Sequence, residues 1–249
     1  MSLMNKTKFV CIDCEATGLD KEGDEIIEIA AMTFTIEKDI EVYDSLVNPG
    51  RQIPEESMKI HHITQDMVKG QPKVQEVLPK IISMISDHII VGHGVSFDIH
   101  LINRDAKRHN IPCTIKSNVF FDTLRMARLY GQSPKNSLEY LRMHFNINEE
   151  GAHRALNDVI VNIEVFKKLA TKYKSAEELK KILEKPVRLK AMPLGKHKGR
   201  PLKEIPLQYL KWAAHMDFDQ DLLYSLRSEI KRRQKAQDFS NSSNPFTGL

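Results

Sequence analysis

The sequence predicts an α/β domain with a mixed sheet, followed by a small basic α+β module. In the first 170 or so residues, short β-branched segments come first and then alternate with longer segments of helical periodicity. Near Lys174 this alternation gives way to a charged segment that ends at Pro186. We therefore expect a main domain over residues 8–174, a linker over 175–187, a module over 188–237 and a flexible tail over 238–249.

The strands of the main domain are expected near its start and between its helices. Phe9–Ile12 is an apolar run that ends at acidic residues, as a buried strand does when it reaches a sheet edge. Residues 26–36 and 40–47 are rich in β-branched side chains and separated by a short polar turn, which is typical of a hairpin. Further short strands are expected at 88–91 and 119–120, and strands that alternate with helices indicate a mixed sheet.

Apolar residues recur at helical spacing in the remaining segments. The expected helices of the main domain cover residues 74–85, 97–107, 123–130, 137–144 and 154–172. In the module, Gly195–Gly199 predicts a turn, and residues 207–216 and 221–235 predict two helices.

The composition is that of a globular protein, with 41% hydrophobic and 28% charged residues. The sequence contains no run of 18 apolar residues, and its first residues lack the apolar stretch of a secretory signal. Three cysteines are too few to staple a secreted chain of 249 residues. We therefore expect a cytoplasmic protein with no membrane partner.

The net charge of +4 is distributed unevenly along the chain. Residues 1–185 carry 25 Lys and Arg against 27 Asp and Glu, whereas residues 186–235 carry 12 against 5, a net charge of +7. This asymmetry makes the basic module a candidate for binding a polyanion. A solvated basic surface without a partner is the alternative.

Asp13 and Glu15 are the first candidate site residues. Side chains at i and i+2 of a strand project from the same face, about 6.6 Å apart along the chain. Like charges this close raise each other's pKa unless a cation lies between them, and carboxylate oxygens suit hard ions such as Mg²⁺ or Mn²⁺. The alternative is a pair of solvated acids at a strand end.

Cys11 and Cys14 form a competing metal pattern. Residues three apart on a strand face opposite sides and lie about 10 Å apart, which is too far for two thiolates to share one ion. We therefore expect both cysteines to be small buried residues.

Two further acids and a histidine complete the candidate set. Asp98 follows a strand end that leads into a helix, and Asp158 lies in a helix that is apolar on more than one side. A buried acid needs a partner. His153 lies just before this helix in a loop opened by Gly151, from which its ring could reach the carboxylates; an ordinary core or surface histidine is the alternative.

These residues fall into three motifs: Asp13-x-Glu15-x-Thr17-Gly18-Leu19, His93-x-x-x-Phe97-Asp98 and His153-x-x-x-x-Asp158. In this order they resemble the DEDD superfamily of 3′–5′ exonucleases, in its histidine-containing DEDDh branch, which includes the proofreading epsilon subunit of bacterial DNA polymerase III. The resemblance spans about residues 8 to 170. It implies a ribonuclease H-like fold, in agreement with the mixed sheet predicted above.

The resemblance also implies a mechanism, in which a metal-dependent 3′–5′ exonuclease releases nucleoside 5′-monophosphates. Two Mg²⁺ or Mn²⁺ ions would be held by Asp13, Glu15, Asp98 and Asp158, and His153 would be the general base. The terminal nucleotide would be contacted by Ala16, Thr17, Leu19 and Phe97. For Leu19 and Phe97, ordinary core packing is the alternative.

Two positions depart from the family pattern. Gly94 stands where the family usually has Asn, and His62, after His61, stands where it usually has Gly. Neither change touches an acid. We expect these departures to affect the shape of the substrate groove rather than the reaction.

The basic module resembles a small module appended to some bacterial exonucleases and helicase-like ATPases. Lys196 and Lys198, in a glycine-flanked turn, are candidate contacts to nucleic acid. Tyr209 and Trp212 either stack on unpaired bases or form the core of this small module, and for Trp212 we favour the core. Our hypothesis is that the module grips single-stranded nucleic acid and feeds a 3′ end to the nuclease.

The expected substrate is the 3′ end of single-stranded nucleic acid, with DNA favoured, in proofreading or repair. A DNA polymerase III partner and a free-standing nuclease both remain open. An exoribonuclease that trims RNA is the first alternative, and it differs by whether a 2′-hydroxyl fits the groove. A non-catalytic binding protein is the second alternative.

Overall fold

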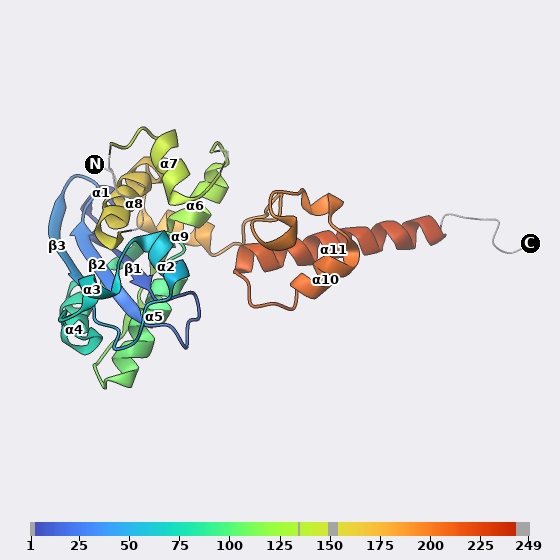
Figure 1. The fold of residues 1–249 in the computed structure, drawn as a ribbon. Helices are drawn as coiled ribbons and strands as arrows, with labels where there is room; N and C mark the ends of the chain where they lie inside the picture. The colour runs from blue at the N-terminus through green and yellow to red at the C-terminus, as the bar shows by residue number, and fades with distance from the viewer. Residues whose placement is uncertain (1–2, 134, 149–153, 243–249) are drawn as a thin grey trace, which may run out of the picture. The chain divides into compact units, whose positions relative to one another are not determined.

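The computed structural model describes residues 3–133, 135–148 and 154–242, with side chains described from Met4 to Ala236 within these ranges. The chain forms two compact units, Met1–Leu183 and Glu184–Leu249. Figure 1 shows a sheet with helices in the first unit, and helices with connecting turns in the second.

The first unit is built on one five-stranded sheet with the order β3-β2-β1-β4-β5. Its strands are β1 (Phe9–Ala16), β2 (Ile26–Phe34), β3 (Asp39–Leu46), β4 (Ile89–Gly92) and β5 (Phe120–Asp122). Strands β1, β2 and β3 pair antiparallel, whereas β4 pairs parallel to β1 and β5 parallel to β4. The predicted α/β fold with a mixed sheet is therefore confirmed.

Helices surround this sheet, and a second set makes up the second unit (Figure 1). In the first unit they are α1 (Leu3–Lys6), α2 (Glu55–His61), α3 (Gln65–Val68), α4 (Val74–Ile85), α5 (Ser96–Arg108), α6 (Thr123–Tyr130), α7 (Leu138–His144), α8 (Ala155–Ala170) and α9 (Ala176–Leu183). The second unit contains α10 (Leu207–Ala213) and α11 (Gln220–Ser242). The predicted bounds of α4 and α6 agree with the structure, while α2, α3 and α9 lie in segments for which we predicted no helix.

Alternate residues of β1 face opposite sides of the sheet, as a strand requires. Phe9 and Cys11 belong to the buried cluster that includes α8, and Val10 and Ile12 belong to a second cluster with α4 and α5. Asp13 continues the odd-numbered series. It therefore lies on the side of the sheet that α8 covers.

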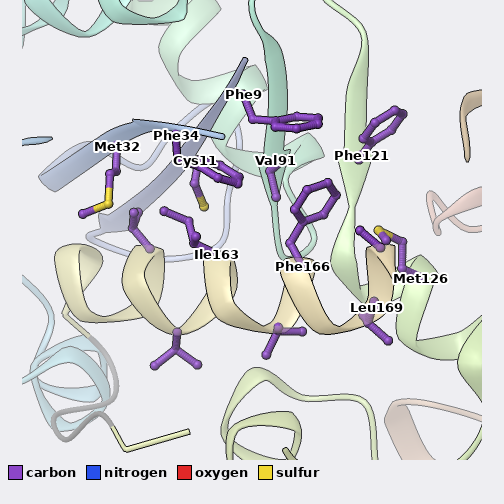
Figure 2. Close-up of a cluster of buried hydrophobic side chains, with 14 of the residues drawn as sticks. Phe9, Cys11, Met32, Phe34, Val91, Phe121, Met126, Ile163, Phe166 and Leu169 are labelled. Carbon is purple, nitrogen blue, oxygen red and sulfur yellow. The ribbon is translucent and has the colours of Figure 1, made fainter. Parts of the chain in front are cut away.

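Four phenylalanines hold α8 against the sheet. Phe166 of α8 lies 5.0 Å from the ring centre of Phe9, 5.9 Å from that of Phe34 and 6.3 Å from that of Phe121. Figure 2 shows Phe166 and Ile163 projecting from the helix toward the strands. Aromatic pairs at these separations add to the stability gained by burial, so α8 has a fixed position on the sheet.

The segment expected as a linker, residues 175–187, differs from that expectation. It contains α9, whose Leu179 and Leu183 are buried in the same cluster as α8. The division between the compact units accordingly falls after Leu183. The many charged residues of this segment form the outer face of an amphipathic helix, and this is why the sequence alone predicts a linker here.

His62 ends α2 in a left-handed conformation, with φ 59° and ψ 16°. Its main-chain N–H donates to the carbonyl of Met58, as glycine commonly does at this position of a helix. This geometry gives a physical reason for the glycine that the family usually carries here. Histidine tolerates the conformation at a cost of about 1–2 kcal/mol.

We expect His62→Gly to raise the free energy of unfolding by up to about 1 kcal/mol, because the relief of strain exceeds the entropy that glycine adds to the unfolded chain. The midpoint of thermal unfolding measures this change, and His62→Ala serves as the control that keeps the strain. A lower midpoint for His62→Gly than for His62→Ala would contradict the assignment.

The second unit has its own apolar core, formed by Met192, Leu202, Ile205, Leu210, Ala213, Ala214, Leu222 and Leu226. Trp212 is not part of it, because 53% of its surface is exposed. The favoured expectation of a buried Trp212 was therefore wrong. Leu210 and Ala213 take the inward positions of the short helix α10, which leaves Trp212 on its outer side.

Across the described part of the chain, no helix combines the length and the apolar character needed to cross a bilayer.

Candidate active site

Three carboxylates converge where β1 ends beside α8. Asp13 and Glu15 project from β1, and Asp158 lies in the first turn of α8. Each offers one oxygen within 4.8 Å of the others, and no other trio of such ligands is this close within the described ranges. The i, i+2 spacing of the strand supplies two of these groups, and the packing of α8 on the sheet supplies the third.

The open end of β1 leaves room for this cluster. Strand β4 pairs with β1 only from Phe9 to Cys11, whereas β1 continues to Ala16 beside β2. Its pairing with β2 is irregular between Glu15 and Ala16. The acids therefore lie where β1 extends past its parallel neighbour, at the kind of sheet edge where α/β proteins place their sites.

Asp98 joins the site from the other side of β1. It lies in the first turn of α5 and is almost fully buried, and its Oδ1 accepts a hydrogen bond from the main-chain N–H of Cys14 at 3.0 Å. This bond fixes Asp98 next to the two acids of β1. Asp98 lines the same pocket as Asp13, Glu15 and Asp158, so the structure brings all four predicted carboxylates together.

The environment of these acids disfavours their charge. Burial, with the nearby Asp98 and Asp158, raises the pKa of Asp13 well above its ordinary value. Burial and the charge of Asp158 raise the pKa of Glu15 to about 8. Burial also raises the pKa of Asp98 to about 7, although hydrogen bonds from its own N–H and that of Cys14 oppose the rise.

A divalent cation fits this donor set. The ligands are carboxylate oxygens alone, which suit Mg²⁺ and Mn²⁺ better than zinc. A cation among them would offset the repulsion that raises their pKa values. Cys11 and Cys14, the competing ligands, are both free and buried, as expected.

The acids form one wall of a pocket of about 360 Å³. Its other walls are contributed by Ala16, Gly18, Leu19, Ser57, Ile60, His61, His93, Gly94 and Phe97. Leu19 is 88% exposed and Ile60 is 58% exposed, whereas Phe97 is partly buried against the core. For Leu19 the alternative of ordinary core packing was therefore wrong. The pocket therefore has acidic side chains on one wall and an apolar rim formed by the exposed Leu19 and Ile60.

Ser57, Ile60 and His61 come from α2, which the sequence analysis did not predict. The helix has only seven residues, and its apolar positions do not extend over enough turns to show a period. A usable signal was Pro54 followed by Glu55 and Glu56, because proline and acids are favoured at the start of a helix.

Thr17 and Gly18 shape the loop that carries Leu19. The Thr17 hydroxyl is buried, where it donates to Asp24 Oδ1 at 2.7 Å and accepts from the main-chain N–H of Glu25 at 3.0 Å. A Cβ on Gly18 would lie 2.4 Å from Asp24 Oδ2, so a larger residue would displace Asp24 from its hydrogen bonds with Thr17 and Asp20. The Thr-Gly pair of the motif therefore stabilises the conformation of the loop. The hydroxyl of Thr17 is used in the hydrogen bonds of this loop.

Gly94, the other departure from the family pattern, has φ +73° and donates its N–H to Asp122 Oδ1 at 3.0 Å. Asp122 also caps α6 by accepting from the N–H of Leu124. A Cβ on Gly94 would meet nothing within 4 Å. Asparagine, which tolerates this conformation, would therefore fit here, and glycine leaves this wall of the pocket more open.

Glu28 anchors the start of α8. It lies opposite Glu15 in the β1–β2 ladder and is buried. Its carboxylate accepts from Arg154 Nη2 at 2.6 Å and Nε at 3.0 Å, and from the N–H of Ala155 at 2.9 Å. Glu28 therefore caps the helix and clamps Arg154, which fixes the turn that carries Asp158.

We expect Glu28→Ala to lower kcat about 10-fold or more with little change in KM, because the first turn of α8 loses its anchor and Asp158 its position. The free energy of unfolding should fall by about 1–3 kcal/mol, as Arg154 is partly exposed and can be solvated. Steady-state kinetics and urea denaturation measure the two effects.

Glu28→Gln is the matched comparison, because its amide oxygen can still cap Ala155 while the charged clamp on Arg154 is lost. This variant should retain more activity than Glu28→Ala. If both variants had the kcat of the wild type, Glu28 would not be a residue that positions Asp158.

His153, the predicted general base, lies outside the described residues. Lys196 and Lys198 belong to the second unit.

Residues 10–166 match the family RNase_T, described as "Exonuclease". Residues 177–228 match a second family, described as "Putative quorum-sensing-regulated virulence factor". The first match contains all four clustered acids, and the second covers α9 except its first residue and most of the second unit.

The chain is similar to DNA polymerase III proteins. It is 38% identical to the epsilon subunit of Aquifex aeolicus over 162 residues, which are 65% of this chain and 79% of that one. It is 35% identical to the PolC-type DNA polymerase III of Caldanaerobacter subterraneus over 75% of this chain but only 14% of that much longer protein. The similarity to the PolC-type enzyme is therefore confined to a small part of that polymerase.

Solved structures share the fold. Exonuclease X in complex with 5′ overhanging duplex DNA aligns with 70% of this chain and 98% of that one, with 26% identity and a TM-score of 0.57. The zinc-bound complex of Escherichia coli exonuclease I with single-stranded DNA aligns with 72% of this chain and 43% of that one, with 20% identity and a TM-score of 0.63. The second likeness is one of fold.

Proposed function

The chain belongs to the RNase_T exonuclease family, and on that premise we propose that it removes nucleotides one at a time from the 3′ end of DNA as nucleoside 5′-monophosphates. The observation that carries this proposal is the convergence of Asp13, Glu15 and Asp158 within 4.8 Å of one another. The homologues named epsilon subunit and the structural neighbour bound to overhanging DNA support DNA as the substrate.

Asp13, Glu15, Asp98 and Asp158 would together hold two Mg²⁺ or Mn²⁺ ions. When bound, such ions polarise the phosphodiester and stabilise charge on the attacking and leaving oxygens. The protein's contribution is to hold the four carboxylates in place, through the ladder of β1 and β2, the Cys14–Asp98 hydrogen bond and the Glu28 anchor of α8.

His153 takes a proton from the attacking water as general base, because an imidazole with a pKa near 6.5 accepts a proton readily at working pH. It immediately precedes Arg154, which Glu28 clamps. The expected result for His153→Gln is a large fall in kcat with metal binding retained.

The apolar rim receives the terminal nucleotide. Leu19 and Ile60 are exposed apolar side chains that line the pocket, and Phe97 also lines it and packs against the core. An unpaired base can cover such side chains, whereas a base within a duplex is already stacked on its neighbours. The rim therefore favours a single-stranded 3′ end, and Ala16 places its main chain beside it.

The direct test compares 5′-labelled single-stranded DNA with RNA of the same sequence, each in Mg²⁺, Mn²⁺ or chelator. We expect a ladder of shortened DNA products that disappears with chelator and in Asp158→Asn. Asp66→Asn, an exposed acid outside the pocket, is the control and should behave as wild type. A ladder from RNA alone would assign the protein to RNA trimming, and intact DNA in every condition would contradict the proposal.

Assembly with a DNA polymerase III is a second proposal, which rests on the similarity to epsilon subunits and to part of the PolC-type enzymes. Co-elution of the full chain with a polymerase III catalytic subunit in size-exclusion chromatography tests it. Separate elution at micromolar concentrations would favour a free-standing nuclease.

A further inference from the structure

Three rings lie in a row on the second unit. The rings of His197 and Tyr209 are 4.4 Å apart and nearly perpendicular, and those of Tyr209 and Trp212 are 5.2 Å apart with an interplanar angle of 50°. His197 is buried, Tyr209 is half-buried and Trp212 is exposed. We name these three residues the aromatic row, which runs from the core of the unit to its surface.

The turn that carries His197 packs closely on this row. Gly195 has φ +71°, and a Cβ at this position would lie 3.1 Å from the Tyr209 hydroxyl. The main-chain N–H of Lys198 donates to the carbonyl of Gly195 and closes the turn. The backbone of Lys196 and Lys198, on either side of His197, is therefore held next to the aromatic row, and both side chains are exposed.

Trp212 lies on the outer side of α10 and makes no contribution to the apolar core of the unit. Small domains depend for their stability on each large apolar side chain that they bury. Trp212 is the only tryptophan in the chain, yet more than half of it faces solvent. The ring lies against Tyr209 in a tilted arrangement, so one side of it is in contact while more than half of its surface stays exposed.

The lysines around the row have no acidic partners. Lys196, Lys198 and Lys211, the neighbour of Trp212, are exposed, and none makes an ion pair or side-chain hydrogen bond with another described residue. Elsewhere in the unit the buried Glu229 is matched by Arg232 at 2.7 Å and Arg233 at 2.9 Å. The positive charge beside the aromatic row is therefore available to a ligand.

We propose that the aromatic row and its three lysines bind single-stranded nucleic acid, with a base stacked on Trp212 and phosphates beside Lys196, Lys198 and Lys211. Stacking on an exposed ring, combined with lysines along a backbone path, is how proteins bind single strands without sequence preference. This inference rests on the proposed function only in taking DNA as the strand. A peptide of acidic residues alone would pair with the lysines, but it has no aromatic ring to stack on Trp212.

Trp212 gives a direct readout, because no other tryptophan contributes to the emission. The full-length chain is titrated in EDTA, to prevent cleavage, with an oligothymidylate of about 16 nucleotides. Base stacking should quench the Trp212 emission and protect it from iodide. Polyglutamate is the competing polyanion and should bind without comparable quenching.

Variants locate the contacts by the anisotropy of a labelled oligothymidylate. Trp212→Ala should weaken binding about 10-fold, and Trp212→Phe should restore part of the loss. Lys196→Ala with Lys198→Ala should lower the slope of log affinity against log salt by about 0.7 per lysine. Lys231→Ala with Lys235→Ala removes the same charge from exposed positions of α11 and should change the affinity much less.

A small substrate separates this proposal from the proposed function. The p-nitrophenyl ester of thymidine 5′-monophosphate needs only the carboxylate site, so Trp212→Ala should hydrolyse it at the wild-type rate. Asp158→Asn should fail to hydrolyse it and still show the quenching.

Unchanged Trp212 emission with oligothymidylate, equal quenching by polyglutamate, or an equal loss in the α11 control would each overturn the proposal. If the wild type did not hydrolyse the p-nitrophenyl ester, the proposed function would be contradicted. The binding result for the aromatic row would not be affected.

Discussion

Asp158→Asn lowers the rate of nucleotide release by at least about 10²-fold, as does Asp13→Asn. Each change removes a negative ligand from the cluster of three carboxylates within 4.8 Å. The loss combines weaker metal binding with misplacement of the reacting groups, and misplacement alone costs about 10²-fold. Single-turnover rates on 5′-labelled single-stranded DNA in Mg²⁺ measure the effect.

The control for this prediction is again Asp66→Asn, which removes the same charge from an exposed position of α3. Circular dichroism should show that all three variants are folded. A rate within about threefold of wild type for either site variant would mean that the carboxylate is a structural acid, and the assignment of the site would fail.

Phe166→Ala lowers the free energy of unfolding of the first unit by about 3–5 kcal/mol, the usual cost of deleting a buried phenylalanine. The ring contacts Phe9, Phe34 and Phe121 and joins α8 to three strands. Its removal leaves a cavity that this rigid sheet cannot close. Urea denaturation followed by far-ultraviolet circular dichroism measures the loss.

Two further variants serve as comparisons for Phe166→Ala. Phe166→Leu should lose much less, because leucine fills part of the space. Leu19→Ala removes an apolar side chain that is almost fully exposed, so its stability should match the wild type. If Phe166→Ala and Leu19→Ala unfolded at the same urea concentration, the four phenylalanines would not be what holds α8 on the sheet.

These two predictions are linked by the architecture. Asp13 and Asp158 are far apart in the sequence, and they meet because α8 packs across β1 and β2 through the phenylalanine cluster. The odd-numbered residues of β1 pass from apolar to acidic on this same face, so the core and the site are consecutive parts of one surface. Changes in the cluster should therefore lower the free energy of unfolding, whereas changes at the acids lower activity in a protein that stays folded.

The carboxylates were predictable because their signal is local. The spacing of Asp13 and Glu15 follows from the period of a strand, and Asp98 and Asp158 each stand in a short motif beside an apolar segment. The mixed sheet was predictable for the same reason, since its strands show either an apolar run or, in β3, β-branched residues after a short polar turn. The structure adds that Glu28, which lies outside the three motifs, anchors the start of α8.

The remaining features depend on tertiary contacts that no local pattern encodes. Ile60 and His61 line the pocket because the short helix α2 places them there. The sequence of α9 resembles a charged linker, and only the burial of Leu179 and Leu183 in the core identifies it as part of the first unit. Trp212 was expected in the core because small modules need apolar side chains. The structure shows that Leu210 and Ala213 fill that role instead.

The measurement that tests the account most directly is binding of Mn²⁺ to the full-length chain, followed by electron paramagnetic resonance without any substrate. We predict that the wild type and Asp66→Asn bind Mn²⁺, and that Asp13→Asn and Asp158→Asn each bind it at least about tenfold more weakly, because each loses one carboxylate of the cluster. Equal Mn²⁺ binding by all four proteins would contradict the claim that these acids form the metal site of a nuclease.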